Sequence, residues 1–273
     1  MEQAGIFADI AHIARTHDPD RFLCALFAPA AKRDALFTLI AFNHELAHAR
    51  EAVTNPVAAL IRLQFWRETV EEARQGGTPR RHAVAAPLHA AIASGLLEPA
   101  DLLAMIEGRE AEAEAPLPTD TAFRSYLRAT AGALAVASGR LLGAEGPDFA
   151  VLQSLGALYG LAGVLRSVGT HAAQGRCLLP ADRLAETGLT VEAAIREPEA
   201  PAMHDLVARL AREGLAAPVP HRGRISPFAI AAALPAVLAR RDLRRLARGR
   251  AVELPRGLGA RLAVTFAGLR GRI

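Results

Sequence analysis

The chain has 273 residues, a net charge of +4, and 51% hydrophobic but only 5% aromatic residues. This length allows one large domain or two small ones, and it is enough to bury a substantial core without stabilisation by a metal ion or a disulfide. The two cysteines, Cys24 and Cys177, stand far apart with no second ligand at metal spacing, which argues against a zinc knuckle and against a disulfide framework.

Ala and Leu dominate the composition, and runs of Val, Ile, Thr and Tyr that would supply strands are few. Helical periodicity recurs almost everywhere, with interruptions at Pro, Gly and Asp. The chain shows no internal repeat and no alternation of strands with helices. The sequence therefore predicts an all-α fold with one domain over residues 1–273.

The interruptions delimit the expected helices. Asp18-Pro19 starts a first helix, Asn55-Pro56 starts another, and Gly76-Gly77 ends that one. The stretch GPDFAVLQSLGALYGLAGVLRSVGTHAAQG predicts one long, mostly buried helix. Further helices are expected over about 31–53, 82–94, 99–114, 120–142, 201–216, 227–248 and 258–270.

The N-terminal stretch MEQAGIFADIAHIART contains Glu2 and Asp9 and lacks a basic region, so it is unlike a signal peptide. The most apolar candidate, SPFAIAAALPAVLA, is too short to span a bilayer and contains Pro235. We therefore expect a cytoplasmic protein without a signal peptide or a transmembrane helix.

Positive charge gathers toward the C-terminus, where twelve arginines from Arg222 onward face only Asp242 and Glu253. Such a tail can contact an anionic surface or an acidic partner, which would place the protein at the periphery of the inner membrane. A solvated basic face is the simpler alternative. Nucleic acid is not an expected partner, because the tail has few aromatics and no recognition motif.

Residues 44–48, HELAH, match the zinc-binding pattern H-E-x-x-H. His44 and His48 lie one turn apart on a helix, Glu45 could orient a water molecule, and Glu68 follows on the next helix as a third ligand. The longer metzincin pattern fails, however, and the preceding segment is helical rather than strand-like. A zinc hydrolase using His44, His48 and Glu68 is therefore only a remote alternative.

The residues on both sides of HELAH identify a family more specifically than the five-residue pattern does. The segment DRFLCALFAPAAKRDALFTLIAFNHELAHAREAVTNPVAALIRLQFWRETVEEA resembles the squalene/phytoene synthase superfamily, most closely its branch containing the mitochondrial respiratory complex I assembly factor 6. YLRATAGALAVAS, with Tyr126 and Gly132, is similar to the family's Tyr-containing helix. LGALYGLAGVLRSVGTHAAQGRCLLPADRLAETGL is similar to its second diphosphate-binding helix and the following GR-x-YLP stretch.

The resemblance covers about residues 20–190 and, more weakly, the stretch ISPFAIAAALPAVLARRDLRRL. It implies an isoprenoid-synthase-like helical bundle with a central cavity. Synthases of this family join two prenyl diphosphates head to head, using Mg²⁺ held by two Asp-rich helices. The resemblance places these residues at the carboxylate positions: Ala47, His48 and Glu51 in the first motif, and Ser167, Thr170 and His171 in the second.

A single Glu51 cannot replace two clusters of carboxylates, and imidazole prefers softer metals to Mg²⁺. We therefore expect a non-catalytic relative with no cofactor, which binds an isoprenoid or lipid or assists a respiratory-complex assembly partner. The alternative is an active head-to-head prenyl diphosphate transferase, which would require Mg²⁺.

The candidate ligand-binding residues are Arg50, Tyr126 and Arg166. Arginines can bind an anionic headgroup without a metal, and Arg166 lies in a largely apolar helix where an unpaired charge would be costly. Several small residues have two possible roles: they could keep an apolar cavity open, or they could simply let helices pack closely. These residues are Ala131, Ala135, Gly156, Gly160 and Gly163.

Overall fold

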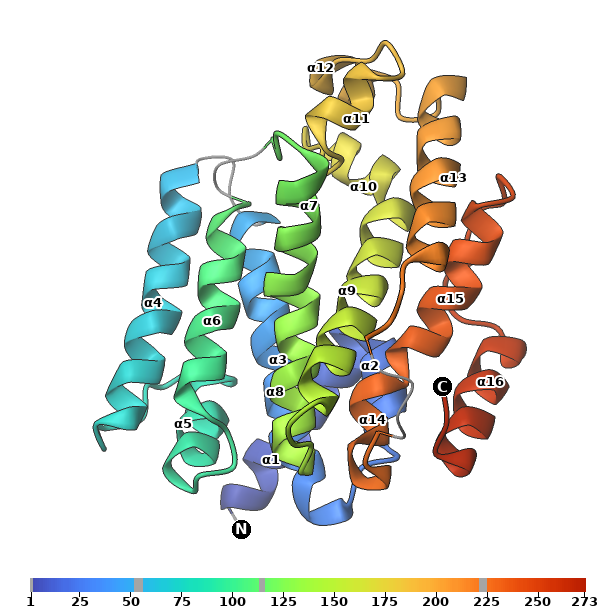
Figure 1. Ribbon diagram of the computed structural model, residues 1–273. Coiled ribbons are helices and arrows are strands. Elements are labelled where there is room, and N and C mark those ends of the chain that lie inside the picture. The colour runs from blue at the N-terminus through green and yellow to red at the C-terminus, as the bar shows by residue number, and fades with distance from the viewer. Residues whose placement is uncertain (1, 52–55, 113–115, 221–224) are drawn as a thin grey trace.

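The computed structural model describes residues 2–51, 56–112, 116–220 and 225–273, and these residues form helices and turns without a strand (Figure 1). The all-α prediction is therefore confirmed for the described residues. The helices are α1 (Glu2–His17), α2 (Pro19–Ala25), α3 (Ala30–Glu51), α4 (Pro56–Arg74), α5 (Ala85–Ala93), α6 (Pro99–Glu110), α7 (Asp120–Leu127), the π-helix η1 (Arg128–Gly132), α8 (Ala133–Leu142), α9 (Asp148–Arg166), α10 (Val168–Ala173), α11 (Ala181–Ala185), α12 (Val191–Arg196), α13 (Pro201–Ala216), the 3₁₀-helix η2 (Pro227–Ala229), α14 (Ile230–Ala233), α15 (Pro235–Leu246) and α16 (Leu258–Arg270).

Local sequence signals set several of these boundaries. The Asp18 side chain caps α2 by accepting a hydrogen bond from the backbone N–H of Arg21, with Pro19 in the first turn. Gly76 takes a positive φ of 75° directly after α4, as glycines that follow helices commonly do. The signal at Asn55 lies outside the described residues.

Three predicted helices differ from the observed ones. The one predicted over 227–248 is divided into η2, α14 and α15, with Pro235 at the start of α15. The stretch over 120–142 is continuous but contains the π-helix η1, whose turns are wider than those of an α-helix. The long helix predicted over residues 146–175 is interrupted at Ser167, whose φ and ψ of −105° and 14° are not helical. Gly169 lowers the helical propensity of the stretch that follows, and α10 forms there as a separate short helix.

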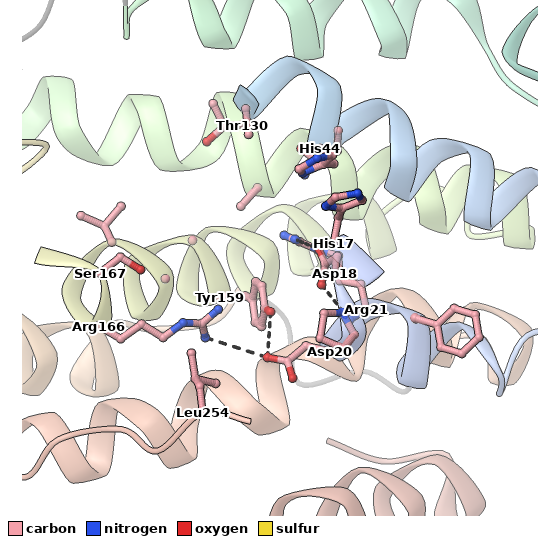
Figure 2. Close-up of a pocket in the computed structure, with 18 of the residues that line it drawn as sticks. His17, Asp18, Asp20, Arg21, His44, Thr130, Tyr159, Arg166, Ser167 and Leu254 are labelled. Atoms are coloured by element: carbon pink, nitrogen blue, oxygen red, sulfur yellow. Dashed lines mark hydrogen bonds and ion pairs between the residues drawn. The ribbon is translucent and has the colours of Figure 1, made fainter. Parts of the chain in front are cut away.

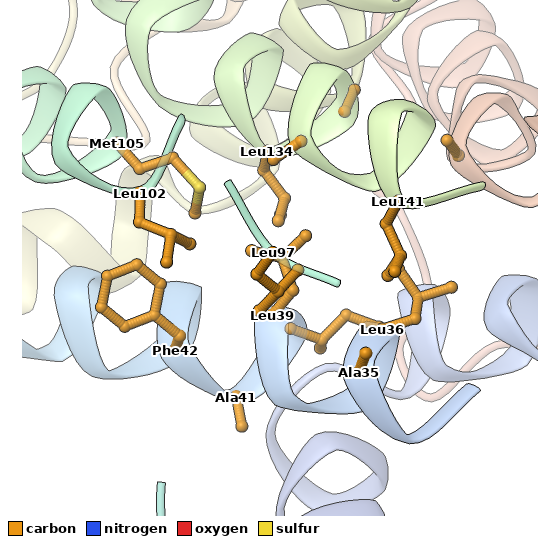
Figure 3. Packing of buried hydrophobic residues seen from close by; sticks show 14 of the residues in the cluster. Ala35, Leu36, Leu39, Ala41, Phe42, Leu97, Leu102, Met105, Leu134 and Leu141 are labelled. Carbon is orange, nitrogen blue, oxygen red and sulfur yellow. The ribbon is translucent and has the colours of Figure 1, made fainter. Parts of the chain in front are cut away.

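The core is built from the inner faces of these helices. Phe42 and Leu39 of α3 pack toward Leu102 and Met105 of α6 and toward Leu134 of α8 (Figure 3). At the centre, α9 contacts α8, η1, α13 and α15. In Figure 1, α4 and α6 lie on one side of this centre, and α13, α15 and α16 lie on the other.

Among the described residues, α9 is the one helix long and apolar enough to cross a membrane. Half of the apolar stretch of α9 is buried inside the bundle, and the helix packs against several neighbouring helices. These contacts identify α9 as the core helix around which the bundle is arranged.

Candidate functional site

A cavity of about 1060 Å³ opens among the helices of the bundle. Its wall combines the end of α1, the start of α2, α3, α7 with η1, α9, and the segment that precedes α16. Figure 2 shows side chains from these separate elements pointing into one space. The cavity is lined both by apolar side chains and by a concentration of charged ones, which is typical of a site for an amphipathic ligand.

One group of charged residues, which we call the Glu112 cluster, consists of Glu112, Arg109, Arg176 and Tyr126. Glu112 is buried, and its carboxylate accepts hydrogen bonds from Arg109, from Arg176 Nη2 at 2.9 Å and from the Tyr126 hydroxyl at 2.7 Å. Burial alone would raise the pKa of Glu112, but Arg109, Tyr126 and Arg176 outweigh burial and hold this pKa below its ordinary value. Burial and the nearby carboxylate raise the pKa of Tyr126, so its hydroxyl stays protonated and donates.

Within the described part of the chain, the Glu112 cluster has one buried donor without an acceptor. Arg176 is only 9% exposed and lines the cavity, but among the described residues no atom accepts a hydrogen bond from its Nη1. A buried donor left without a partner is costly, so an acceptor that reached this position would stabilise the cluster.

A second group, which we call the paired cluster, consists of Asp20, Asp242, Arg166 and Arg256. Arg256 Nη2 donates to Asp20 at 2.8 Å and to Asp242 at 2.7 Å, while Arg166 donates to Asp242 at 3.0 Å. The Tyr159 hydroxyl donates to Asp20 at 3.1 Å (Figure 2). The cluster joins α2, α9, α15 and the segment before α16, so two carboxylates and two guanidinium groups neutralise each other where these elements meet.

The cavity carries an excess of positive charge. Among the described residues, seven arginines line it, against three carboxylates, which are Asp18, Asp20 and Glu112. Asp18 is itself paired with Arg21 at 2.7 Å. Even when Asp242 of the paired cluster is counted, three positive charges remain in excess, which favours an anionic occupant.

The residues of the predicted first motif are not gathered in the cavity. Ala47 lines it, His48 is exposed on the outer side of α3, and the side chain of Glu51 lies outside the described residues. His44 does line the cavity, where its ring stacks on His17 with 4.0 Å between the centroids. Ala47 contributes no oxygen to this wall.

The structure does not bring together the three residues of the zinc alternative. Glu68 is bound to Arg80, whose Nη2 donates to it at 2.9 Å. His44 and His48 stack with 5.6 Å between their ring centroids. Across the described ranges, no group of three or more His, Cys, Asp or Glu side chains is arranged to hold a metal ion.

The residues of the predicted second motif are also only partly located in the cavity. Ser167 and His171 line the cavity beside the break between α9 and α10, whereas Thr170 is exposed. Of the candidate ligand-binding residues, Tyr126 and Arg166 line the cavity, each within one of the two clusters. Arg50 is half-buried on α3 and is not part of the cavity wall.

The small residues of α9 divide between the two roles considered for them. A Cβ on Gly156 would overlap the carbonyl oxygen of Ala131, and one on Gly160 would lie 2.9 Å from the Ala131 side chain. These two glycines therefore permit close packing of α9 against η1. Gly163 lines the cavity, and a Cβ at this position would meet nothing within 4 Å, so this glycine leaves open space.

Sequence reasoning did not single out the residues that complete the clusters, which are Asp20, Arg109, Glu112, Arg176, Asp242 and Arg256. Arg176 carried a signal, because it lies in the GRCLLP stretch. Arg109 and Glu112 are only three residues apart, but the remaining cluster residues pair with partners up to 236 positions away, which no local spacing indicates.

Comparisons with known proteins agree on the family. The family model described as squalene/phytoene synthase matches residues 14–266. The complex I assembly factor 6 of Bos taurus is 29% identical over 203 residues, 71% of this chain, and the Homo sapiens protein is 27% identical over 209 residues, 74% of this chain. The chain spans 59% and 61% of the length of these two relatives.

Solved structures agree with the fold. A dehydrosqualene synthase crystallised with a ligand superposes with a TM-score of 0.71 at 16% identity, covering 98% of this chain and 97% of that one. A squalene synthase from Alicyclobacillus acidocaldarius superposes with a TM-score of 0.66 at 17% identity, covering 99% and 95%. The helical bundle is thus isoprenoid-synthase-like, and with the family match over residues 14–266 the chain belongs to the squalene/phytoene synthase family.

Proposed function

We propose that this chain is a non-catalytic member of its family that binds an amphipathic anion, such as an isoprenoid diphosphate or an anionic lipid, in the main cavity. The observation that carries the proposal is Arg176, which lines the cavity and whose buried Nη1 has no acceptor among the described residues. A phosphate oxygen is a strong acceptor for guanidinium donors, and the positive excess around the cavity favours a negatively charged headgroup.

The residues of the cavity do not fit the magnesium chemistry of the synthases. Mg²⁺ is held through carboxylates and water, with the ligands in near-octahedral geometry. The carboxylates of the described cavity wall are already bound to arginines: Asp18 to Arg21, Asp20 to Arg256, and Glu112 to Arg109 and Arg176. Ala47 and Ser167, which line the wall at motif positions, offer no carboxylate.

Arginine can replace Mg²⁺ in binding a diphosphate but not in promoting its ionisation. Guanidinium groups neutralise and orient an anionic headgroup, so they support binding. Ionisation of an allylic diphosphate requires much stronger stabilisation of the leaving group, for which synthases use several divalent ions. Binding without turnover is therefore the outcome that this set of side chains favours.

The named relatives point to a biological setting for such a protein. Two of them are complex I assembly factors, and we extend that role to this chain as part of the proposal. A bound amphipathic ligand would then serve assembly of a respiratory complex, as cargo or as a structural component, rather than be converted into a product.

The test is a binding and turnover experiment with farnesyl diphosphate as the probe. We expect saturable binding that is unchanged when EDTA replaces Mg²⁺, and no released diphosphate in either buffer. Magnesium-dependent diphosphate release would contradict the proposal and favour the prenyl transferase. Stoichiometric zinc in a metal-resolved mass analysis, lost in His44→Ala, would favour the hydrolase instead.

A further inference from the structure

The C-terminal helix α16 has its large apolar side chains on the outside. Leu258, Leu262, Phe266 and Leu269 are each more than half exposed, and their spacing of four, four and three residues places them on one face. The inward face carries small residues instead, with Val264 fully buried and Ala260 and Ala267 packed against the core. A helix of an isolated globular protein normally has the opposite arrangement.

A cluster of arginines borders this exposed face. Arg240, Arg241 and Arg244 of α15 and Arg270 and Arg272 at the end of the chain line a groove of about 570 Å³ together with Phe266. Among the described residues none of these five forms an ion pair with a carboxylate. Burial and the neighbouring Arg244 lower the pKa of Arg240, as expected where like charges crowd together without a counter-charge.

The nearby carboxylates are occupied elsewhere. Asp242 belongs to the paired cluster, and Glu253 is bound to Arg245 at 2.8 Å. The exposed apolar face and the arginine cluster meet at Phe266. They lie on the edge of the bundle where α15 packs against α16, and Figure 1 shows these two helices side by side.

We propose that α16 and the adjoining arginine cluster form a docking surface for an anionic lipid bilayer. An interfacial helix buries its apolar side chains at the level of the headgroups while flanking cations contact anionic lipid. Both components are present here, since the leucines and Phe266 supply the apolar contact and the five arginines supply the charge. A second copy of this chain is a poorer occupant, because a symmetric contact would bring two such arginine clusters together.

Docking in this way would also orient the main cavity. Leu254, Pro255 and Arg256 precede α16 and line that cavity, and Arg261 of α16 lines it as well. Leu254 is itself mostly exposed. The side of the cavity formed by these residues would therefore lie next to the bilayer, which gives an amphipathic ligand a direct route between lipid and cavity.

The first test measures co-sedimentation of the full chain with phosphatidylcholine vesicles that contain or lack phosphatidylglycerol. We expect binding to the anionic vesicles only, and loss of this binding as salt is raised. Leu262→Gln should reduce partitioning about tenfold, because an exposed leucine no longer enters the interface. Arg270→Gln should reduce it about fivefold.

Matched controls come from the far side of the bundle. Ile61 of α4 is 66% exposed, against 65% for Leu262, and Arg62 follows it on the same helix. Ile61→Gln and Arg62→Gln should leave vesicle binding unchanged. Equal binding to neutral and anionic vesicles, or equal losses from the α4 variants, would overturn the proposal, as would a dimer that Leu262→Gln dissociates.

A label tests the orientation independently. Both native cysteines are buried, so an environment-sensitive maleimide dye will react with an introduced surface cysteine. Dye on Leu258→Cys should shift to the blue with anionic vesicles, and dye on Ile61→Cys should not; the reverse result would overturn the orientation. Farnesyl diphosphate binding by Leu262→Gln without vesicles should equal that of the unmodified chain, so docking and cavity binding can fail separately.

Discussion

The two charge clusters beside the cavity combine carboxylates and guanidinium groups in different proportions. The paired cluster sets Asp20 and Asp242 against Arg166 and Arg256, and its charges balance. The Glu112 cluster sets one carboxylate against Arg109 and Arg176, and one guanidinium nitrogen has no acceptor among the described residues. Both clusters are at least partly buried, so solvent does little to reduce this difference.

The difference separates a structural role from a binding role. A balanced, hydrogen-bonded set of buried charges holds its elements in place and leaves little for a ligand to satisfy. An unbalanced set keeps a donor and a positive charge available to whatever enters the cavity. We infer that the paired cluster fixes the C-terminal helices to the bundle, whereas the Glu112 cluster recognises the ligand.

The largest effect should follow from unbalancing the paired cluster. Asp242→Asn removes a charge that faces both Arg166 and Arg256, so two buried guanidinium groups are left with Asp20 alone. Removing one partner of a buried ion pair typically costs about 3 to 5 kcal/mol. Urea denaturation monitored by circular dichroism would give the change in the free energy of unfolding.

Glu253→Gln is the matched control for that variant. Glu253 also pairs with an arginine of α15, Arg245, but its side chain is 81% exposed. Solvent screens such a pair, so we expect little change in stability. If both variants destabilise the protein equally, burial is not the source of the strength of the paired cluster.

The sequence predicted the helices better than it predicted the charge clusters. Helical periodicity and the breaks at Pro, Gly and Asp predicted most helices, because a helix depends on residues within a few turns of one another. Tyr126 and Arg166 were identified through the family resemblance. Glu112 was not, because its partner Arg176 is 64 residues away and only the packed bundle brings them together. The break at Ser167 was missed because no proline marks it and a single glycine, Gly169, does not by itself end a helix.

An intermediate effect, with its own pH dependence, is expected for Glu112→Gln. The amide keeps the shape but removes the charge that Arg109 and Arg176 share, which should cost about 2 to 3 kcal/mol near neutral pH. The pKa of Glu112 is lower in the folded chain than its ordinary value of 4.5. Its carboxylate therefore stabilises the fold fully above that ordinary value, and this contribution is lost as the pH falls through the folded pKa.

The measurement is the difference in melting temperature between the unmodified chain and Glu112→Gln across a pH series. The difference in melting temperature should be constant above about pH 5. It should shrink below about pH 4, where Glu112 of the unmodified chain also becomes protonated and neutral. A difference that grows on acidification would mean that Glu112 is not held ionised by its arginines.

The smallest change in stability, but a clear change in ligand binding, is expected for Arg176→Gln. Glu112 keeps Arg109 and Tyr126 as donors, and the variant removes a buried donor that has no acceptor among the described residues. These two effects oppose each other, so the free energy of unfolding should change by about 1 kcal/mol or less. Affinity for farnesyl diphosphate should fall about tenfold, because a charged donor to the headgroup is lost.

Arg183→Gln provides the opposite pattern. Arg183 has a side-chain exposure of 14% and makes ion pairs with Glu213 outside the cavity. Its loss should lower stability and leave the affinity for farnesyl diphosphate unchanged. If Arg183→Gln weakens binding as much as Arg176→Gln does, the loss reflects general loosening of the bundle. If only Arg176→Gln weakens it, the unbalanced charge of the Glu112 cluster is what the ligand contacts.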